Sequence, residues 1–175
     1  MRPCRIAGRT YFPDYLALRY PVTLFGYIGR HMRVQGAHST AMVYDILAFA
    51  GMSPSVITGA AILSLQKEQG VFGNVYKGNS DILVIEADES DGSIVKYQPY
   101  LGLCLNLQKD HKEINILQGY FKEFISHCKT AIINAEEENL RVLGGDKTFG
   151  LSMGDVHPTD IKADGFGSDF TINGQ

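Results

Sequence analysis

The chain has 175 residues, of which 45% are hydrophobic and 20% are charged, and its formal net charge at pH 7 is −3. This length suits one domain, and the composition is that of an ordinary globular protein. No block of Lys and Arg indicates a nucleic-acid surface, and no apolar run reaches the ~18 residues that a membrane span requires. The three cysteines are widely spaced, which is typical of reduced thiols. We therefore expect a cytoplasmic protein that binds neither nucleic acid nor membrane.

The N-terminal segment, residues 1–33, has a turn signal at Tyr11–Asp14 and a short predicted helix over Tyr15–Tyr20, but no recognisable chemistry. We assign it to no domain. From Val34 to Leu47 the pattern predicts the end of a buried strand, a turn at Gly36 and the start of an amphipathic helix. This layout is typical of a phosphate-binding loop, although the Lys that such a loop carries before its helix is missing.

The rest of the chain alternates between predicted strands and helices. Such alternation predicts an α/β fold with a mostly parallel sheet flanked by helices. Gln66–Ser80 is polar and rich in glycine, which indicates a loop or hairpin. The other predicted elements are strands at Ser55–Thr58, Asp81–Ile85, Tyr100–Leu105, Thr130–Asn134, Thr148–Leu151 and Phe170–Ile172, and a helix at Leu117–Cys128.

Polar residues follow three of the apolar strands, at Gly36, Glu86 and Asn106. In parallel sheets, ligands bind beyond the carboxyl ends of the strands, so these clusters predict a site. Four of the six residues from Glu86 to Asp91 are carboxylates. They are either a solvated acidic turn or part of a magnesium site, since magnesium is often held by one or two carboxylates together with substrate phosphates.

The histidines divide into candidates and non-candidates. His111, after Asp110 at a strand end, is either a surface residue or a metal ligand or general base oriented by its neighbour. His38 either contacts a phosphate or is a polar turn residue. We assign no role to His127, at a predicted helix end, or to His157.

Several motifs together resemble the Mur ligase family. The stretch Glu86–Ser93, EADESDGS, resembles the family's E-A-D-E-S-D-[GA]-S signature, and in particular the branch that joins L-alanine to UDP-N-acetylmuramate. Asn106–His111 is similar to N-x-E-P-D-H, and Ala41–Leu47 to the helix after the family's G-T-H-G-K-T-T loop. Two further matches are Gly73-Asn74 with a substrate-side G-x-N-A segment and Asn134–Glu137 with N-x-D-D.

The resemblance implies a P-loop-like central ATPase domain of an ATP-dependent amide ligase, over residues 34–175. ATP would phosphorylate the carboxylate of UDP-N-acetylmuramate, and L-alanine would attack the acyl phosphate. The implied magnesium ligands and catalytic residues are Glu86 and His111, and Asn74 would lie near the UDP-sugar. The implied nucleotide-binding residues are Gly36, His38, Ser39, Thr40 and Asn106.

This chain departs from the family pattern in two respects. Four residues, including the Lys, are missing between His38 and Met42, and Gln108-Lys109 stands where the family has Glu-Pro. We also expect that the family's N-terminal UDP-binding and C-terminal amino-acid-binding domains are absent. Two functions follow: a fragment or degraded copy of the ligase, or a non-catalytic relative that binds nucleotide or UDP-sugar. A homo-oligomer or a partner could supply the missing domains.

Overall fold

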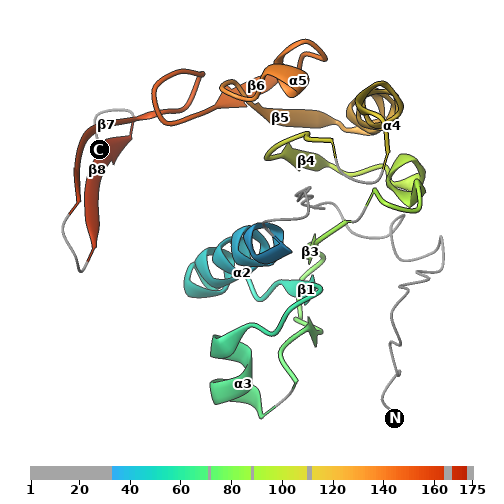
Figure 1. Ribbon diagram of the computed structural model, residues 1–175. Coiled ribbons are helices and arrows are strands. Elements are labelled where there is room, and N and C mark those ends of the chain that lie inside the picture. The colour runs from blue at the N-terminus through green and yellow to red at the C-terminus, as the bar shows by residue number, and fades with distance from the viewer. Residues whose placement is uncertain (1–32, 71, 88, 110–111, 164–166, 173–175) are drawn as a thin grey trace.

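The computed structural model describes residues 33–70, 72–87, 89–109, 112–163 and 167–172. The predicted helix over Tyr15–Tyr20 and the candidates Asp110 and His111 lie outside these residues. The described elements follow the predicted alternation, which confirms the α/β fold (Figure 1). In chain order they are α2 (Arg33–Phe49), β1 (Ser55–Ile57), α3 (Leu63–Gln69), β2 (Val75–Tyr76), β3 (Leu83–Ile85), the 3-10 helix η1 (Ser93–Lys96), β4 (Leu101–Cys104), α4 (Ile114–His127), β5 (Thr130–Asn134), α5 (Glu138–Arg141), β6 (Lys147–Phe149), β7 (Pro158–Ala163) and β8 (Ser168–Ile172).

The described strands form two three-stranded sheets and one hairpin. In the first sheet, β1 is parallel to β3, with Val56 opposite Val84, and β2 adds to β1 in the antiparallel direction. In the second sheet, β4, β5 and β6 are all parallel. The strands are thus mostly parallel, as predicted, but the described residues divide them between two sheets.

A shared hydrophobic core joins the two sheets. Ile85 of β3 and Cys104 of β4 belong to the same buried cluster as Leu117, Phe121 and Phe124 of α4. The three α4 residues are spaced at i, i+4 and i+7, so they lie on one face of the helix. The apolar stripe of α4 therefore closes the core where the two sheets approach each other.

Helix α2 covers the first sheet, and it corrects one prediction. It runs without interruption from Arg33 to Phe49, so the predicted strand end at Val34 and turn at Gly36 are wrong. Ala37, Thr40 and Tyr44, at i, i+3 and i+7, are buried, and Tyr44 packs in a cluster with the β1 and β3 valines. Burial of this face stabilises a helix, rather than a loop, in the segment that the sequence suggested was a phosphate loop.

The segment predicted as a loop or hairpin, Gln66–Ser80, contains the end of one helix and a short strand. Helix α3 extends to Gln69 and ends at Gly70, which has the left-handed backbone (φ 63°) common after helices. Leu65 of α3 is buried to 2% exposure, and β2 then pairs with β1. The prediction missed these elements because the last turn of a short helix and a two-residue strand give almost no periodic signal.

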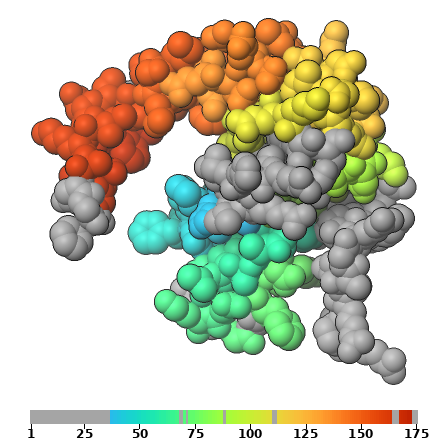
Figure 2. Space-filling view, in the orientation of Figure 1, coloured from blue at the N-terminus to red at the C-terminus, as the bar shows by residue number. Residues whose placement is uncertain are grey.

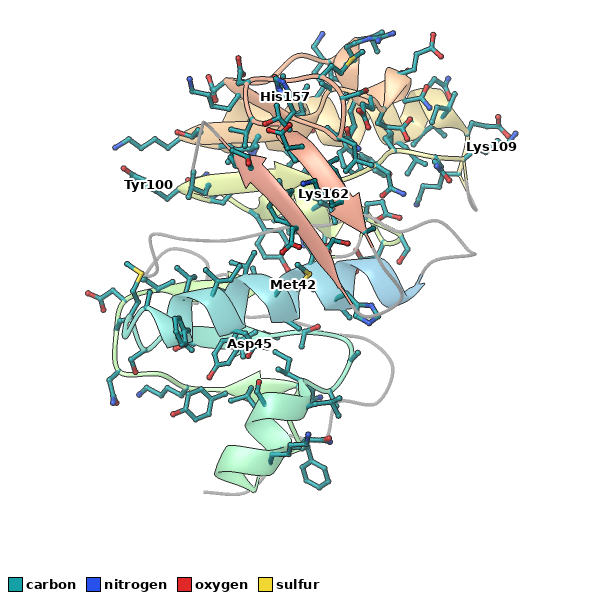
Figure 3. All side chains as sticks on the ribbon, turned by 90° about the vertical axis from the view of Figure 1, so that its left-hand side faces the viewer. Met42, Asp45, Tyr100, Lys109, His157 and Lys162 are labelled. Carbon is teal, nitrogen blue, oxygen red and sulfur yellow. The ribbon has the colours of Figure 1, made fainter. Side chains whose placement is uncertain are left out.

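The C-terminal hairpin projects from the body of the molecule. In Figures 1 and 2, β7 and β8 form an arm that extends away from the two sheets. Strand β7 was not predicted, whereas β8 includes the predicted Phe170–Ile172. Among the described residues, no helix combines the length and apolar character needed to cross a membrane.

Candidate functional site

The carboxyl end of β3 places Glu86 against the neighbouring strand. The Glu86 backbone N–H donates to the Ile57 carbonyl at 2.9 Å and so extends the β1–β3 ladder by one residue. The Glu86 Oε2 accepts two hydrogen bonds, from Thr58 Oγ1 at 2.7 Å and from Gly59 N at 2.8 Å. Two donors on one oxygen fix the orientation of the whole carboxylate.

Thr58 also contacts the predicted substrate-side residue. Its backbone N–H donates to the Asn74 carbonyl at 3.0 Å, next to the pairing of Ile57 with Val75. Because β2 is antiparallel to β1, Asn74 lies at the same end of the sheet as Thr58 and Glu86. The structure therefore brings together two residues that the sequence had predicted separately, Glu86 and Asn74, with Thr58 between them.

The donor set at Glu86 fits a magnesium ion that is shared with a ligand. Glu86 is half-buried, and none of the described residues donates a hydrogen bond to its Oε1. No group of three or more His, Cys, Asp or Glu residues in the described part of the chain could hold a metal by itself. One free carboxylate oxygen suits magnesium that keeps its waters and binds phosphate oxygens, and it does not suit a closed protein cage.

The other described carboxylates of the acidic run have different environments. Glu89 is buried, at 6% exposure. Asp91 Oδ1 accepts a hydrogen bond from Ser93 N at 2.8 Å, and its bonds to Ser93, led by that to the side chain, hold the pKa of Asp91 below its ordinary value. This Asp91–Ser93 turn leads into η1. The run is therefore neither a uniform metal site nor a uniform solvated turn.

Asn106 follows β4 in a loop that is held by other amides. Asn134 Nδ2 donates to the Leu105 carbonyl at 3.0 Å, and Asn139 Nδ2 donates to the Leu107 carbonyl at 2.9 Å. The Oδ1 of Asn106 is buried and has no hydrogen-bond partner among the described residues, an arrangement that is costly unless a donor reaches it. Leu107 shares the buried cluster with Ala87, so the segments that follow β3 and β4 converge.

The residues of the predicted phosphate loop are not arranged as a loop. Gly36, His38, Ser39 and Thr40 all lie within α2, where backbone N–H groups beyond the first turn pair with carbonyls four residues earlier. Thr40 is 3% exposed, so its hydroxyl faces the interior, whereas His38 is exposed. The helix thus removes the backbone cradle that such a loop offers to phosphate, and the nucleotide-binding role of these residues stays a prediction.

The two described cysteines are free, as the spacing predicted. Burial raises the pKa of the Cys128 thiol to about 12, and it also raises the pKa of Cys104 well above its ordinary value. Both residues are therefore protonated at neutral pH, and neither is an activated nucleophile.

Comparisons with known proteins show which proteins this chain is similar to. The UDP-N-acetylmuramate–L-alanine ligase of Desulforapulum autotrophicum is 32% identical over 156 residues, which cover 79% of this chain and 33% of that protein. The solved UDP-N-acetylmuramate–alanine ligase of Thermotoga maritima superposes with a TM-score of 0.74 at 24% identity, over 89% of this chain and 34% of that one. The MurF ligase of the same organism, solved in complex with ADP, superposes with a TM-score of 0.58 at 21% identity, over 98% of this chain and 45% of that one. No family model matches the sequence.

The fold is that of an α/β domain like those of the Mur ligases. The chain is a relative of the Mur ligases, which confirms the predicted resemblance, and the similar curated proteins are UDP-N-acetylmuramate–L-alanine ligases. The chain spans between 21% and 33% of the length of three of these ligases.

Sequence reasoning missed Thr58 and Gly59. It predicted Thr58 as the last residue of a strand and gave Gly59 no role. A signal was present, because the Thr58-Gly59 pair ends a buried strand in the same way that Glu86 ends β3. Their partnership with Glu86 was not visible, since it depends on the parallel pairing of β1 with β3.

Proposed function

We propose that the chain is the nucleotide-binding unit of an ATP-dependent ligase of the UDP-N-acetylmuramate–L-alanine type, as a fragment or degraded copy of that enzyme. The observation that carries this proposal is the oriented carboxylate of Glu86, which Thr58 links to Asn74 at the same end of the first sheet. The 32% identity to a ligase of that name supports it. We place the protein in the cytoplasm, in peptidoglycan synthesis.

The proposed roles follow from the chemistry of acyl-phosphate formation. Glu86 would hold the magnesium ion through Oε1, to which no described residue donates, and His111 would be the second ligand. Asn74 lies toward the UDP-sugar, while Asn106 and the start of α2, from Gly36 to Thr40, lie toward the nucleotide. Magnesium, when bound, offsets the negative charge of the phosphates during transfer. The residues of this chain would orient the substrate carboxylate, which takes the γ-phosphoryl group of ATP while ADP leaves. The amine of L-alanine then attacks the acyl phosphate, loses a proton and displaces phosphate.

A second candidate function is a binding module without turnover. The observation that favours it is the unbroken helix α2, because no Lys occurs in Arg33–Phe49 and Thr40 is buried. A phosphate-loop Lys forms a hydrogen-bonded ion pair, and truncating one partner of such a pair costs about 2–5 kcal/mol. We therefore expect ATP affinity to be weaker by roughly one to three orders of magnitude than with an intact loop.

Calorimetry of ATP binding with and without magnesium tests the nucleotide site. We expect weak binding that strengthens with magnesium, and loss of this enhancement in Glu86→Gln. A variant with Gly-Lys-Thr-Thr inserted between His38 and Ser39 should bind ATP more tightly, by the same one to three orders. Micromolar ATP binding that is independent of magnesium would contradict the proposed site.

Phosphate release with ATP, UDP-N-acetylmuramate and L-alanine present separates the two functions. We expect no substrate-dependent release from this chain, because holding the reactants together can supply about 7–11 kcal/mol of the barrier reduction. Holding the reactants together would require the parts of the relatives that this chain does not span. Those parts would have to be supplied by the same polypeptide, a second copy or a partner. Turnover by the unmodified chain would rule out the non-catalytic reading.

A further inference from the structure

We infer that Thr58 is a positioning residue that sets the orientation of Glu86 for magnesium and links it to the substrate-side segment at Asn74. This inference rests on the proposed function, because it assigns the purpose of Thr58 to that metal site. Thr58 is 6% exposed, so its hydroxyl is not a surface group. Its side chain and its backbone each make one hydrogen bond toward a different predicted site residue.

The side-chain bond decides which oxygen of Glu86 is available. Thr58 Oγ1 at 2.7 Å and Gly59 N at 2.8 Å both donate to Oε2, whereas no described residue donates to Oε1, so Oε1 is the atom that would bind a cation. A carboxylate that is not held can rotate and offer either oxygen, and it loses conformational entropy when it binds. Groups that orient a metal ligand in this way usually change metal affinity about 10–100-fold when they are removed.

The backbone bond extends this arrangement across the sheet. Thr58 N donates to the Asn74 carbonyl at 3.0 Å, and Asn74 leads directly into β2. Gly73, just before it, has a φ of 85°, and its backbone carbonyl accepts from Ile62 N at 2.8 Å. The segment around Asn74 is therefore fixed on one side by α3 and on the other by Thr58. A displacement of Thr58 would move both the metal ligand and the substrate-side segment.

The test compares Thr58→Val, which removes the hydroxyl, with Thr58→Ser, which keeps it. The quantity measured by calorimetry is the ratio of ATP affinity with Mg²⁺ to ATP affinity without Mg²⁺. We expect Thr58→Val to lower this ratio about 10-fold, at the lower end of the range because Gly59 N still donates to Glu86. Thr58→Ser should retain most of the wild-type ratio.

Ser55→Ala is the matched control, in the strand that Thr58 directly follows. Ser55 is also buried, and its Oγ accepts a hydrogen bond from Gly78 N at 3.1 Å, but it lies at the opposite end of β1. This change should lower the melting temperature without changing the magnesium ratio. A purely structural role for Thr58 would make Thr58→Val behave like this control.

The outcomes separate the inference from the function on which it rests. If Glu86→Gln abolishes the magnesium enhancement and Thr58→Val leaves it intact, the inference is wrong and the metal site stands. If the wild-type affinity does not respond to magnesium, or if Glu86→Gln leaves the response unchanged, both fail. A lower ratio in Thr58→Val that Thr58→Ser restores supports the positioning role.

Discussion

Gly78 lies where no side chain can be accommodated. A Cβ at this position would meet the backbone carbonyl oxygens of Ser53 and Pro54, which cannot move aside as a flexible side chain can. The Gly78 backbone N–H also donates a hydrogen bond to Ser55 Oγ, which holds the Gly78 backbone close to the segment before β1. The turn between α2 and β1 thus packs directly on the segment between β2 and β3.

We therefore predict that Gly78→Ala destabilises the protein by about 1–3 kcal/mol, the usual cost of overpacking. The free energy of unfolding from denaturant titration measures the effect. Gly119→Ala is the control, because Gly119 is exposed on α4 and an added Cβ there has no neighbour within 4 Å. That change should stabilise the helix by about 0.5–1 kcal/mol. Equal effects of the two changes would contradict the packing argument.

A second residue-scale prediction concerns acid. The Thr148 backbone N–H at 2.8 Å and its hydroxyl at 3.0 Å donate to Asp155, and they lower the pKa of Asp155 below its ordinary 3.8. A group with a lowered pKa stabilises the fold above its ordinary pKa, and the stabilisation is lost as the pH falls through the folded value. We expect Asp155→Asn to melt below the wild type at neutral pH.

The difference in melting temperature should shrink as the pH falls below about 3.8, because the wild-type carboxylate then becomes neutral too. Thermal unfolding followed by circular dichroism over a pH series measures it. Asp169→Asn, on the exposed β8 strand, is the control and should show little difference at any pH. A difference in melting temperature between Asp155→Asn and the wild type that stays constant at acid pH would contradict this role of the Asp155 carboxylate.

At the scale of the element, α2 can be tested directly, because the structure has a continuous helix where the family resemblance implies a phosphate loop. In the structure His38 lies in the sixth position of a continuous helix. A proline there would remove a helical hydrogen bond and clash with the preceding turn, which costs about 3 kcal/mol or more. In a phosphate loop the same proline would cost much less.

We predict that His38→Pro lowers both helical content and the free energy of unfolding, whereas His38→Ala changes stability by less than about 0.5 kcal/mol. Circular dichroism and denaturant titration measure the two quantities. An unchanged His38→Pro protein would indicate that Arg33–Phe49 is not one helix in solution.

Elements with a strong local signal were predicted well. The strand Thr130–Asn134 has the same bounds in the structure. The predicted Leu117–Cys128 helix is α4, which begins earlier, at Ile114, and ends at His127. Helix α2 was predicted to begin too late, because Gly36 indicated a turn more strongly than Ala37, Thr40 and Tyr44 indicated a buried face. Glu86 was found because it directly follows an apolar run. Its partner Thr58 is 28 residues away, a pairing that no local pattern contains.

At the scale of the whole molecule, one core connects the two sheets. Phe124 is fully buried among residues from β3, β4, β5 and α5. Because these strands belong to different sheets, the sheets cannot lose their packing independently. The body of the molecule should therefore unfold as one cooperative unit.

We predict that Phe124→Ala costs about 3–5 kcal/mol and speeds hydrogen exchange in β3 and β5 alike. Phe170→Ala, on the arm at 55% exposure, should change the unfolding free energy by less than about 0.5 kcal/mol. Hydrogen exchange read by mass spectrometry resolves the strands. Faster exchange confined to β4–β6 would show that the two sheets are separate units.

The arm formed by β7 and β8 has a consequence for how the protein behaves in concentrated solution. A two-stranded ribbon with exposed Ile161 and Phe170 offers both of its edges to the strands of other molecules. The register of the hairpin shifts between Thr159 and Lys162, where Asp160 has a φ of 53°. Such a kink, with a charged Lys beside it, interrupts the flat edge that aggregation needs. We therefore expect the irregularity in β7 to disfavour edge-to-edge pairing along that strand.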